Sequence, residues 1–126
     1  MIKKDLLYTS EHEWARVEGD IVTVGITDHA QELLGELTYV ELPEVGAEVK
    51  IGDEIGVVES SKSASDVYSP AEGKIIEVND SLEDNPEQIN EECYGEGWIC
   101  KIQISGKESV KGLMSGEEYE EFLVGI

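Results

Sequence analysis

The sequence is poor in basic residues. Lysine and arginine together number 9 of the 126 residues, against 29 aspartates and glutamates, so the formal net charge is −20. Nucleic acids are bound by clustered lysines and arginines, and anionic membrane surfaces attract the same residues. We therefore expect neither nucleic acid nor membrane as a partner. The acidic charge favours steering towards partners with basic docking faces.

Cysteine is also scarce, and long apolar runs are missing. Cys93 and Cys100 lie seven positions apart, which is neither the spacing of a redox pair nor that of a zinc site. No stretch is long enough to span a bilayer, and no long apolar run follows the first lysines as in a secretory signal. We expect a monomer in a reducing, cytoplasmic compartment, with Cys100 as a buried thiol.

The usual signatures of catalysis are absent. The sequence has no glycine-rich phosphate loop and no nucleophile elbow, and its two histidines, His12 and His29, do not have metal-site spacing. The carboxylates lack the alternating oxygen pattern of a calcium loop. These absences predict no metal site and no catalytic residues, so we expect that the chain is not an enzyme by itself.

The apolar residues that are present, 40% of the chain, follow regular patterns and are numerous enough for one core, which predicts a single domain over residues 1–126. Short strands separated by turn residues predict a mainly β fold. Residues 18–20 are a hairpin turn in this interpretation. In the strand 38–42, alternation places Thr38, Val40 and Leu42 on one face.

Two short helices interrupt the strands. The first is expected near residues 28–34, with Asp28 as the N-cap, Gln31 completing a capping box and Gly35 ending the helix. Its apolar face would consist of Ala30, Leu33 and Leu34. The second is expected at the C-terminus, near residues 116–124, where Ser115 and Glu118 have capping-box spacing.

One segment combines features that favour covalent modification. Lys62 is surrounded by small residues between two strand-like runs, which predicts an open hairpin tip. Carboxylates at Glu59 and Asp66 favour the protonated amine. Lys62 is therefore not expected to act as a nucleophile, which needs a lowered pKa. An open, unactivated lysine suits acylation by another enzyme, although a solvated lysine on a turn is the commoner meaning of this pattern.

The sequence resembles the H proteins of the glycine cleavage system along nearly its whole length. Six segments at compatible spacing carry the resemblance: YTSEHEW (8–14), VGITDHAQELL (24–34), VELPEVG (40–46), VESSKSASDVY (58–68), YGEGWICKI (94–102) and LMSGEEY (113–119). Small departures are Ser61 and Ser63, where the family commonly has valine and alanine, and Glu11, where some members have serine. None of these departures changes Lys62.

The resemblance implies a fold and a set of site residues. The fold is a flattened antiparallel β-sandwich, the barrel-sandwich hybrid of lipoyl and biotinyl carriers. Lys62 would carry lipoate in amide linkage as N6-lipoyllysine, with Glu59 in the motif that the attaching ligase recognises. The aminomethyl cargo would be paired by Glu13 and Asp66, and a cleft wall would shield it, formed by Ile26, Ala30 and Leu34.

The resemblance also implies partners and a reaction order. A pyridoxal-phosphate glycine decarboxylase would load the lipoyl arm with an aminomethyl group, and a tetrahydrofolate-dependent aminomethyltransferase would remove it. Dihydrolipoyl dehydrogenase would reoxidise the arm, and a lipoate ligase or lipoyl transferase would attach it.

Five alternatives remain open from the sequence. A lipoyl domain of a 2-oxo-acid dehydrogenase complex would be shorter, and a biotinyl carrier typically has its lysine between methionines. An H-like relay would donate lipoyl groups to other complexes, and a degenerate paralogue would never be loaded. An acidic interaction module would leave Lys62 unmodified.

Overall fold

The computed structural model describes residue 3 and residues 5–126. The expected lack of a secretory signal rests partly on residues 1, 2 and 4, which lie outside these ranges. Among the described helices, none has the length and apolar character needed to cross a membrane.

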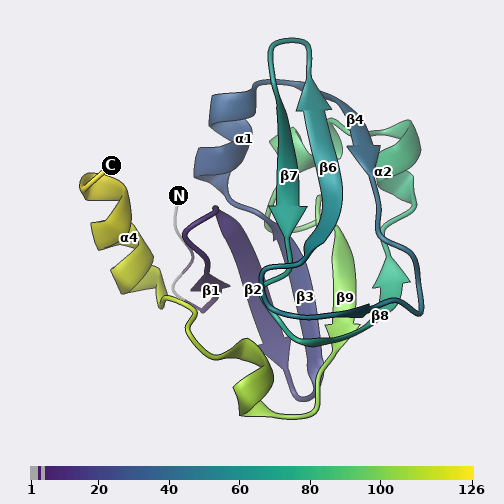
Figure 1. Ribbon diagram of the computed structural model, residues 1–126. Coiled ribbons are helices and arrows are strands. Elements are labelled where there is room, and N and C mark those ends of the chain that lie inside the picture. Colours follow the sequence, from purple (N-terminus) through teal and green to yellow (C-terminus); the bar gives the residue numbers. More distant parts are fainter. Residues whose placement is uncertain (1–2, 4) are drawn as a thin grey trace.

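The described strands form two antiparallel sheets, as the β-rich pattern predicts (Figure 1). The larger sheet has the order β1-β2-β3-β9-β8-β5 and the smaller has the order β4-β6-β7. The strand bounds are Leu7–Tyr8 (β1), Glu13–Glu18 (β2), Ile21–Ile26 (β3), Leu37–Glu41 (β4), Glu48–Val49 (β5), Glu54–Ser60 (β6), Ala64–Tyr68 (β7), Gly73–Val78 (β8) and Cys100–Gln103 (β9). One apolar core joins the sheets, containing Val24 and Ile102 from the larger sheet and Val58 and Val67 from the smaller. The β-sandwich expectation is confirmed.

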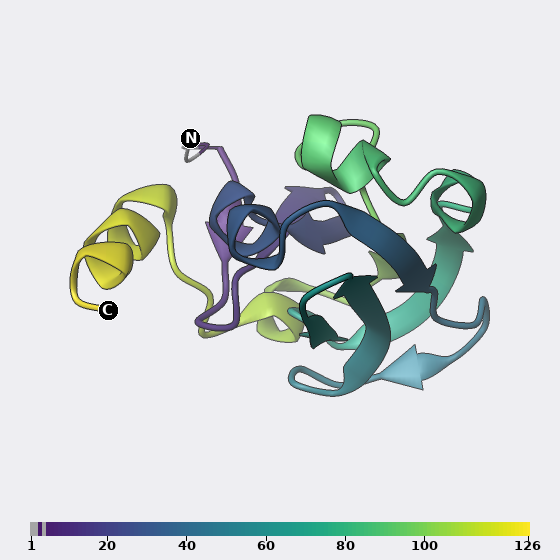
Figure 2. The same ribbon diagram turned by 90° about the horizontal axis from the view of Figure 1, so that it is seen from above.

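Short helices cover the ends of this sandwich. Their bounds are Asp28–Leu34 (α1), Ser81–Asp84 (α2), Gln88–Glu91 (α3), Lys107–Val110 (η1, a 3₁₀ helix) and Gly116–Val124 (α4). Ser115 and Glu118 form the expected capping box at the start of α4. Figure 2 shows α4 standing at one side of the sheets, with α2 at the opposite side.

The expected first helix is confirmed, but two details of it were wrong. Its N-cap is Thr27 rather than Asp28, because the Thr27 hydroxyl accepts the Ala30 N–H while Asp28 is already helical and accepts from the Gln31 side chain instead. Leu33 is 63% exposed and does not belong to the apolar face. The burial of Leu34 without Leu33 shows that α1 presents only a narrow stripe to the core.

The expected alternation around β4 was wrong at Thr38, whereas Val40 is buried and Leu42 packs against the core as expected. The pairing of β4 with β6 shifts register between Leu37 and Tyr39, and this irregularity moves Thr38 to the exposed side. Leu37 and Val40, three positions apart, are the residues of β4 that face the core. A bulge adds one residue to a strand and so breaks the period of two on which the expectation relied.

Both cysteines are buried, as expected for Cys100. Burial raises the pKa of the Cys100 thiol to about 12 and that of Cys93 to about 11. Thiols with such high pKa values are almost wholly protonated near neutral pH and are therefore poor nucleophiles.

Candidate functional site

The lysine singled out in the sequence lies at the tip of the β6–β7 hairpin, which projects at the top of Figure 1. The Ser60 N–H donates to the Ser63 carbonyl over 2.8 Å, closing the turn. The Ser60 hydroxyl oxygen accepts the N–H groups of Lys62 and Ser63 at 3.4 and 3.2 Å. The turn is thus built from small polar residues, and Lys62 is exposed on it.

The stem of Lys62 lies against Gly35, the residue that ends α1. A Cβ atom added at Gly35 would lie 3.2 Å from Cε of Lys62 and 3.7 Å from its Nζ. Gly35 also has φ +85°, a left-handed conformation that side chains other than glycine adopt at a cost. The missing side chain therefore leaves room for the lysine methylenes. The amine itself lies near the C-terminal end of α1, where the helix dipole favours a cation.

Glu13 is the buried acid of this region, with only 1% of its surface exposed. Its Oε1 accepts a short hydrogen bond from the Thr9 hydroxyl, and its Oε2 accepts the Tyr68 N–H over 3.0 Å. Burial raises the pKa of the Glu13 carboxyl above its ordinary value, and the two hydrogen bonds oppose that rise. The Glu13 side chain is therefore held by two hydrogen bonds, one from the loop that precedes β2 and one from the end of β7.

Asp66 lies exposed on β7 and is connected to Glu13 through Tyr68. The Tyr68 hydroxyl lies 3.5 Å from Oδ2 of Asp66, while the main-chain N–H of the same residue binds Glu13. A side-chain hydrogen bond between Glu54 and Asp66 raises the pKa of the Glu54 carboxyl. The structure thus places the two expected pairing acids on either side of one tyrosine and adds Glu54 as a third acid.

The three expected wall residues lie on β3 and α1. Ile26 pairs with Glu13 in the β2–β3 ladder and is buried. Leu34 is buried, and Ala30 is half-buried and packs against the same core. Ile26 and Glu13 are therefore brought together, while Ile26 and Leu34 are largely covered in this structure.

Glu59 lies on β6 beside the hairpin tip. It is half-buried, pairs with Ala64 across the hairpin and with Tyr39 of β4, and its carbonyl oxygen accepts the Thr38 hydroxyl over 3.3 Å. Tyr39 is 49% exposed. The segment that precedes Lys62 is thus held on both sides.

Comparison with known proteins now decides the family. The sequence profile described as glycine cleavage H-protein matches residues 6–126. The chain belongs to the glycine cleavage H-protein family. It is 58% identical over 123 residues to the glycine cleavage system H protein of Stenotrophomonas maltophilia strain K279a, covering 97% of this chain and 94% of the relative. It is 55% identical over 118 residues to that of Rubrobacter xylanophilus, covering 94% and 91%.

A solved structure supports the same assignment. The crystal structure of an H protein from Mycobacterium marinum superposes with a TM-score of 0.89 at 41% identity, covering 99% of this chain and all of the other. The expected family and carrier fold are confirmed. Family membership makes this chain a lipoyl carrier component of glycine cleavage.

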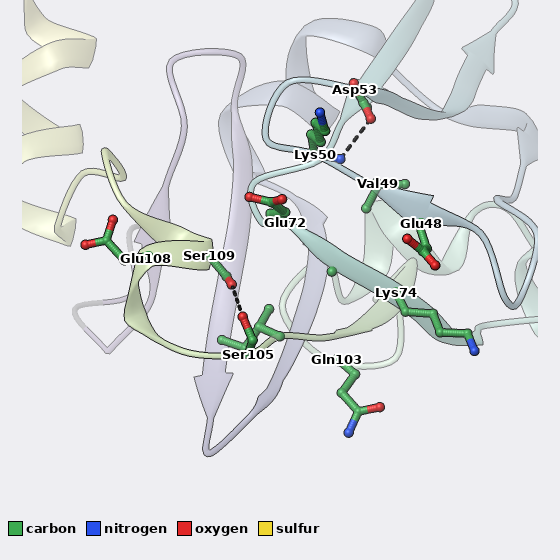
Figure 3. Close-up of a pocket in the computed structure, with 12 residues that line it drawn as sticks. Glu48, Val49, Lys50, Asp53, Glu72, Lys74, Gln103, Ser105, Glu108 and Ser109 are labelled. Atoms are coloured by element: carbon green, nitrogen blue, oxygen red, sulfur yellow. Dashed lines mark hydrogen bonds between the residues drawn. The ribbon is translucent and has the colours of Figure 1, made fainter.

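A separate cavity of this H-family chain lies around β5 and β8 (Figure 3). It has a volume of about 600 Å³ and is lined by polar side chains, among them Glu48, Lys74 and Gln103. Asp53 in its lining precedes β6, whereas Lys62 follows that strand, and β6 alone spans roughly 20 Å at about 3.3 Å per residue. None of the site residues named above is among the residues that line it. Among the described residues, no group of three or more side chains could hold a metal ion.

Sequence reasoning missed Thr9, Glu54 and Tyr68 as parts of the site. Thr9 lies four residues from Glu13, but Tyr68 is 55 positions away and contributes its main chain. A main-chain donor leaves no mark in a sequence pattern. Glu54 lies opposite Tyr68 in the β6–β7 register. The expected hairpin was therefore the only feature of the sequence that could have placed Glu54 near the site.

Proposed function

We propose that Lys62 carries lipoate as N6-lipoyllysine and that this chain is a non-catalytic carrier. The observation that supports this most directly is the exposed lysine at a hairpin tip, with its stem against Gly35, where a Cβ would crowd it. A lysine placed in this way fits an amide-linked arm, because acylation removes only an exposed charge. We assign the whole chain to one carrier domain in a cytoplasmic, monomeric protein.

The residues of the chain provide attachment, reach and shielding. When bound, the lipoyl group supplies a disulfide that takes up the aminomethyl group of glycine and is later regenerated from the dithiol. Lys62 tethers that group, which raises its effective concentration at each partner site. Glu59 contributes to recognition by the ligase or lipoyl transferase. The chain contributes no group that makes or breaks bonds.

The partners follow from the family. They are glycine decarboxylase, aminomethyltransferase and dihydrolipoyl dehydrogenase, together with the enzyme that attaches lipoate. The net charge of −20 favours docking faces that are basic. Association with such faces would weaken as salt screens the charges.

Glu13 and Asp66 pair the amine of the cargo. Carboxylates nearby favour the protonated amine, and a protonated amine has no free lone pair to assist loss of its carbon from sulfur. Asp66 meets the cargo at the surface, while Glu13, held by Thr9 and Tyr68, adds negative charge from beneath. Ile26, Ala30 and Leu34 form the apolar wall on the other side.

The attachment site is tested by mass spectrometry. The protein is produced in a host able to make and attach lipoate, and its intact mass and peptide map are compared with those of Lys62→Arg. The wild type should gain the mass of one lipoyl group on the peptide that contains Lys62, and Lys62→Arg should gain none. Lys50→Arg is the matched control, since Lys50 is an exposed lysine at the opposite end of β6. An unmodified wild type would contradict the proposal and favour an interaction module.

The amine-pairing role is tested on lipoylated protein. Asp66→Asn combined with Glu13→Gln keeps the side-chain volumes, so lipoylation should be unchanged. Release of formaldehyde and ammonia from the loaded protein should become about tenfold faster, equivalent to a loss of about 1.4 kcal/mol. Asp53→Asn, an acid at the far end of β6, serves as the control. An unchanged lifetime of the loaded cargo in the double variant would show that neither acid pairs the cargo amine.

A further inference from the structure

The C-terminal helix contacts the site from behind through one hydroxyl group. Tyr119 of α4 is fully buried. Its hydroxyl oxygen lies 2.9 Å from Oγ1 of Thr27 and 2.7 Å from Nδ1 of His12. The two residues that it joins are only 15 positions apart, whereas Tyr119 lies 92 and 107 positions away from them.

Both partners of Tyr119 are immediate neighbours of site residues. His12 precedes Glu13 and Thr27 follows Ile26, and Glu13 and Ile26 pair in the β2–β3 ladder. The ladder continues one step further, because the Thr27 N–H donates to the His12 carbonyl over 3.0 Å. Tyr119 therefore connects the two chain segments next to Glu13 and Ile26, which are the acid and the wall residue of the proposed cargo site.

The hydrogen bonds form a directed chain when His12 is neutral with an unprotonated Nδ1. The Tyr119 hydroxyl then donates to that nitrogen and must itself accept from the Thr27 hydroxyl. Thr27 Oγ1 also accepts the Ala30 N–H at 3.2 Å, which caps α1. Each hydroxyl donates one hydrogen bond, so every donor has an acceptor in this series of hydrogen bonds. The series runs from α1 through Tyr119 of α4 to His12, in the loop that leads to Glu13.

From this geometry we propose that Tyr119 is a positioning residue. Through it, α4 holds in place Glu13 and Ile26, the acid and the wall residue of the proposed cargo site. The inference deepens the proposed carrier function and rests on it for the meaning of that site. It requires only residues of this chain. Tyr119 does not contact the cargo and acts through His12 and Thr27.

The position of His12 makes this arrangement sensitive to protonation. The His12 ring lies 4.6 Å from the ring of His29 on α1 and also faces Tyr119 and Phe122 on α4. Glu11 is the charged neighbour on its own loop, and Asp28, Glu32 and Glu120 line the hollow beside His29. Burial and His29 lower the pKa of His12, with Glu11 opposing. A proton on Nδ1 would reverse the hydrogen bond to Tyr119 and add a positive charge beside His29.

The experiment compares two buried, stacked tyrosines. Tyr8 lies 4.5 Å from Tyr119 between ring centroids, but its hydroxyl bonds to the main chain of Lys3. In unlipoylated protein at pH 7.5, Tyr119→Phe should speed amide hydrogen exchange of Thr27 and Tyr68 by roughly three- to tenfold, as expected for one lost hydrogen bond. Tyr8→Phe should leave both rates unchanged. Equal rates in the two variants would overturn the proposal.

A second variant addresses the proton. Corrected for intrinsic exchange, the Thr27 amide of the wild type should exchange faster at pH 5.0 than at pH 7.5. The Tyr68 amide is left out of this comparison because it donates to Glu13, whose own pKa is raised. His12→Asn should keep the slow rates at pH 7.5 and abolish the difference, because asparagine tolerates the positive φ of 71° and offers an acceptor that does not titrate. A pH difference that survives in His12→Asn would overturn the role of His12.

A final comparison separates this inference from the carrier function. In lipoylated, loaded protein, Tyr119→Phe should shorten the cargo lifetime while Tyr8→Phe does not. Failure of the carrier function would show as an unmodified Lys62 in the wild type, which the exchange measurements do not involve. A loaded wild type whose cargo lifetime is equal in both variants would overturn the positioning role alone.

Discussion

The two ends of β7 are built in opposite ways. At its start, Lys62 stands on an exposed turn of serines whose hydrogen bonds are local. At its end, Tyr68 binds a carboxylate that is almost completely buried and belongs to β2. In the proposed function, the arm must be reached by large partner enzymes, whereas its cargo must be kept from water. A single short strand connects the accessible end to the protected one, roughly 20 Å apart.

The comparison predicts that substitutions at the protected end cost more stability than substitutions at the accessible end. Gly25→Ala tests the protected end with the largest expected effect. A Cβ at Gly25 would lie 2.5 Å from the indole of Trp14, which is fully buried and donates its N–H to the Cys93 carbonyl over 2.9 Å. Since neither group has room to move, we expect a loss of about 3 kcal/mol in the free energy of unfolding, measured in urea.

The control for this substitution is Gly106→Ala. A Cβ at Gly106 meets open space, and its φ of 167° is ordinary extended backbone. Its stability should remain within about 0.5 kcal/mol of the wild type. Similar losses at both glycines would show that the Trp14 region is no more tightly packed than the surface.

A second prediction concerns the pH dependence of stability at Glu13. Its folded-state pKa is raised above the ordinary 4.5, so the folded protein binds a proton more tightly than the unfolded chain does. The corresponding stability is present below about pH 4.5 and is lost as the pH rises through the folded pKa. The midpoint of thermal unfolding, measured from pH 4 to 7, should contain this downward contribution in the wild type and lack it in Glu13→Gln.

The difference between the two proteins isolates this carboxyl from the many other acids. A difference curve that rises with pH instead would mean that the bonds from Thr9 and Tyr68 outweigh burial. Glu13 would then stabilise the fold as a charged group.

The smallest effect is expected at the accessible end. Ser61→Ala and Ser63→Ala change exposed side chains of the turn, so unfolding free energies should stay within about 0.5 kcal/mol and lipoylation should be complete. Ser60→Ala should cost more than either, since the Ser60 hydroxyl oxygen accepts two N–H groups. Equal effects of all three substitutions, measured in urea, would mean that this hydroxyl does not hold the turn.

The sequence predicts well those features that are encoded locally. The Lys62 hairpin, the helix that Gly35 ends and the Ser115–Glu118 capping box each depend on residues within a few positions of one another. Thr38 was misplaced because the bulge in β4 depends on its pairing with β6.

The candidate site was predictable only in part, for a related reason. The resemblance to H proteins identified Glu13, but the general preference of acids for the surface gave no sign that it is buried. Tyr68 binds it through a main-chain N–H, and Tyr119 supports its loop from 107 positions away. Such contacts between distant segments exist only once the sheets and α4 have assembled.

The glycine at the end of α1 has a mechanical consequence for the arm. Since Cε of Lys62 lies beside Gly35, the freely rotating part of the proposed lipoyl tether would begin near Nζ rather than at the main chain. A shorter lever sweeps a smaller volume, so its tip would spend more time close to the face that contains α1. A single absent methyl group would thereby set the pivot, and with it the radius that a partner's active-site entrance must match.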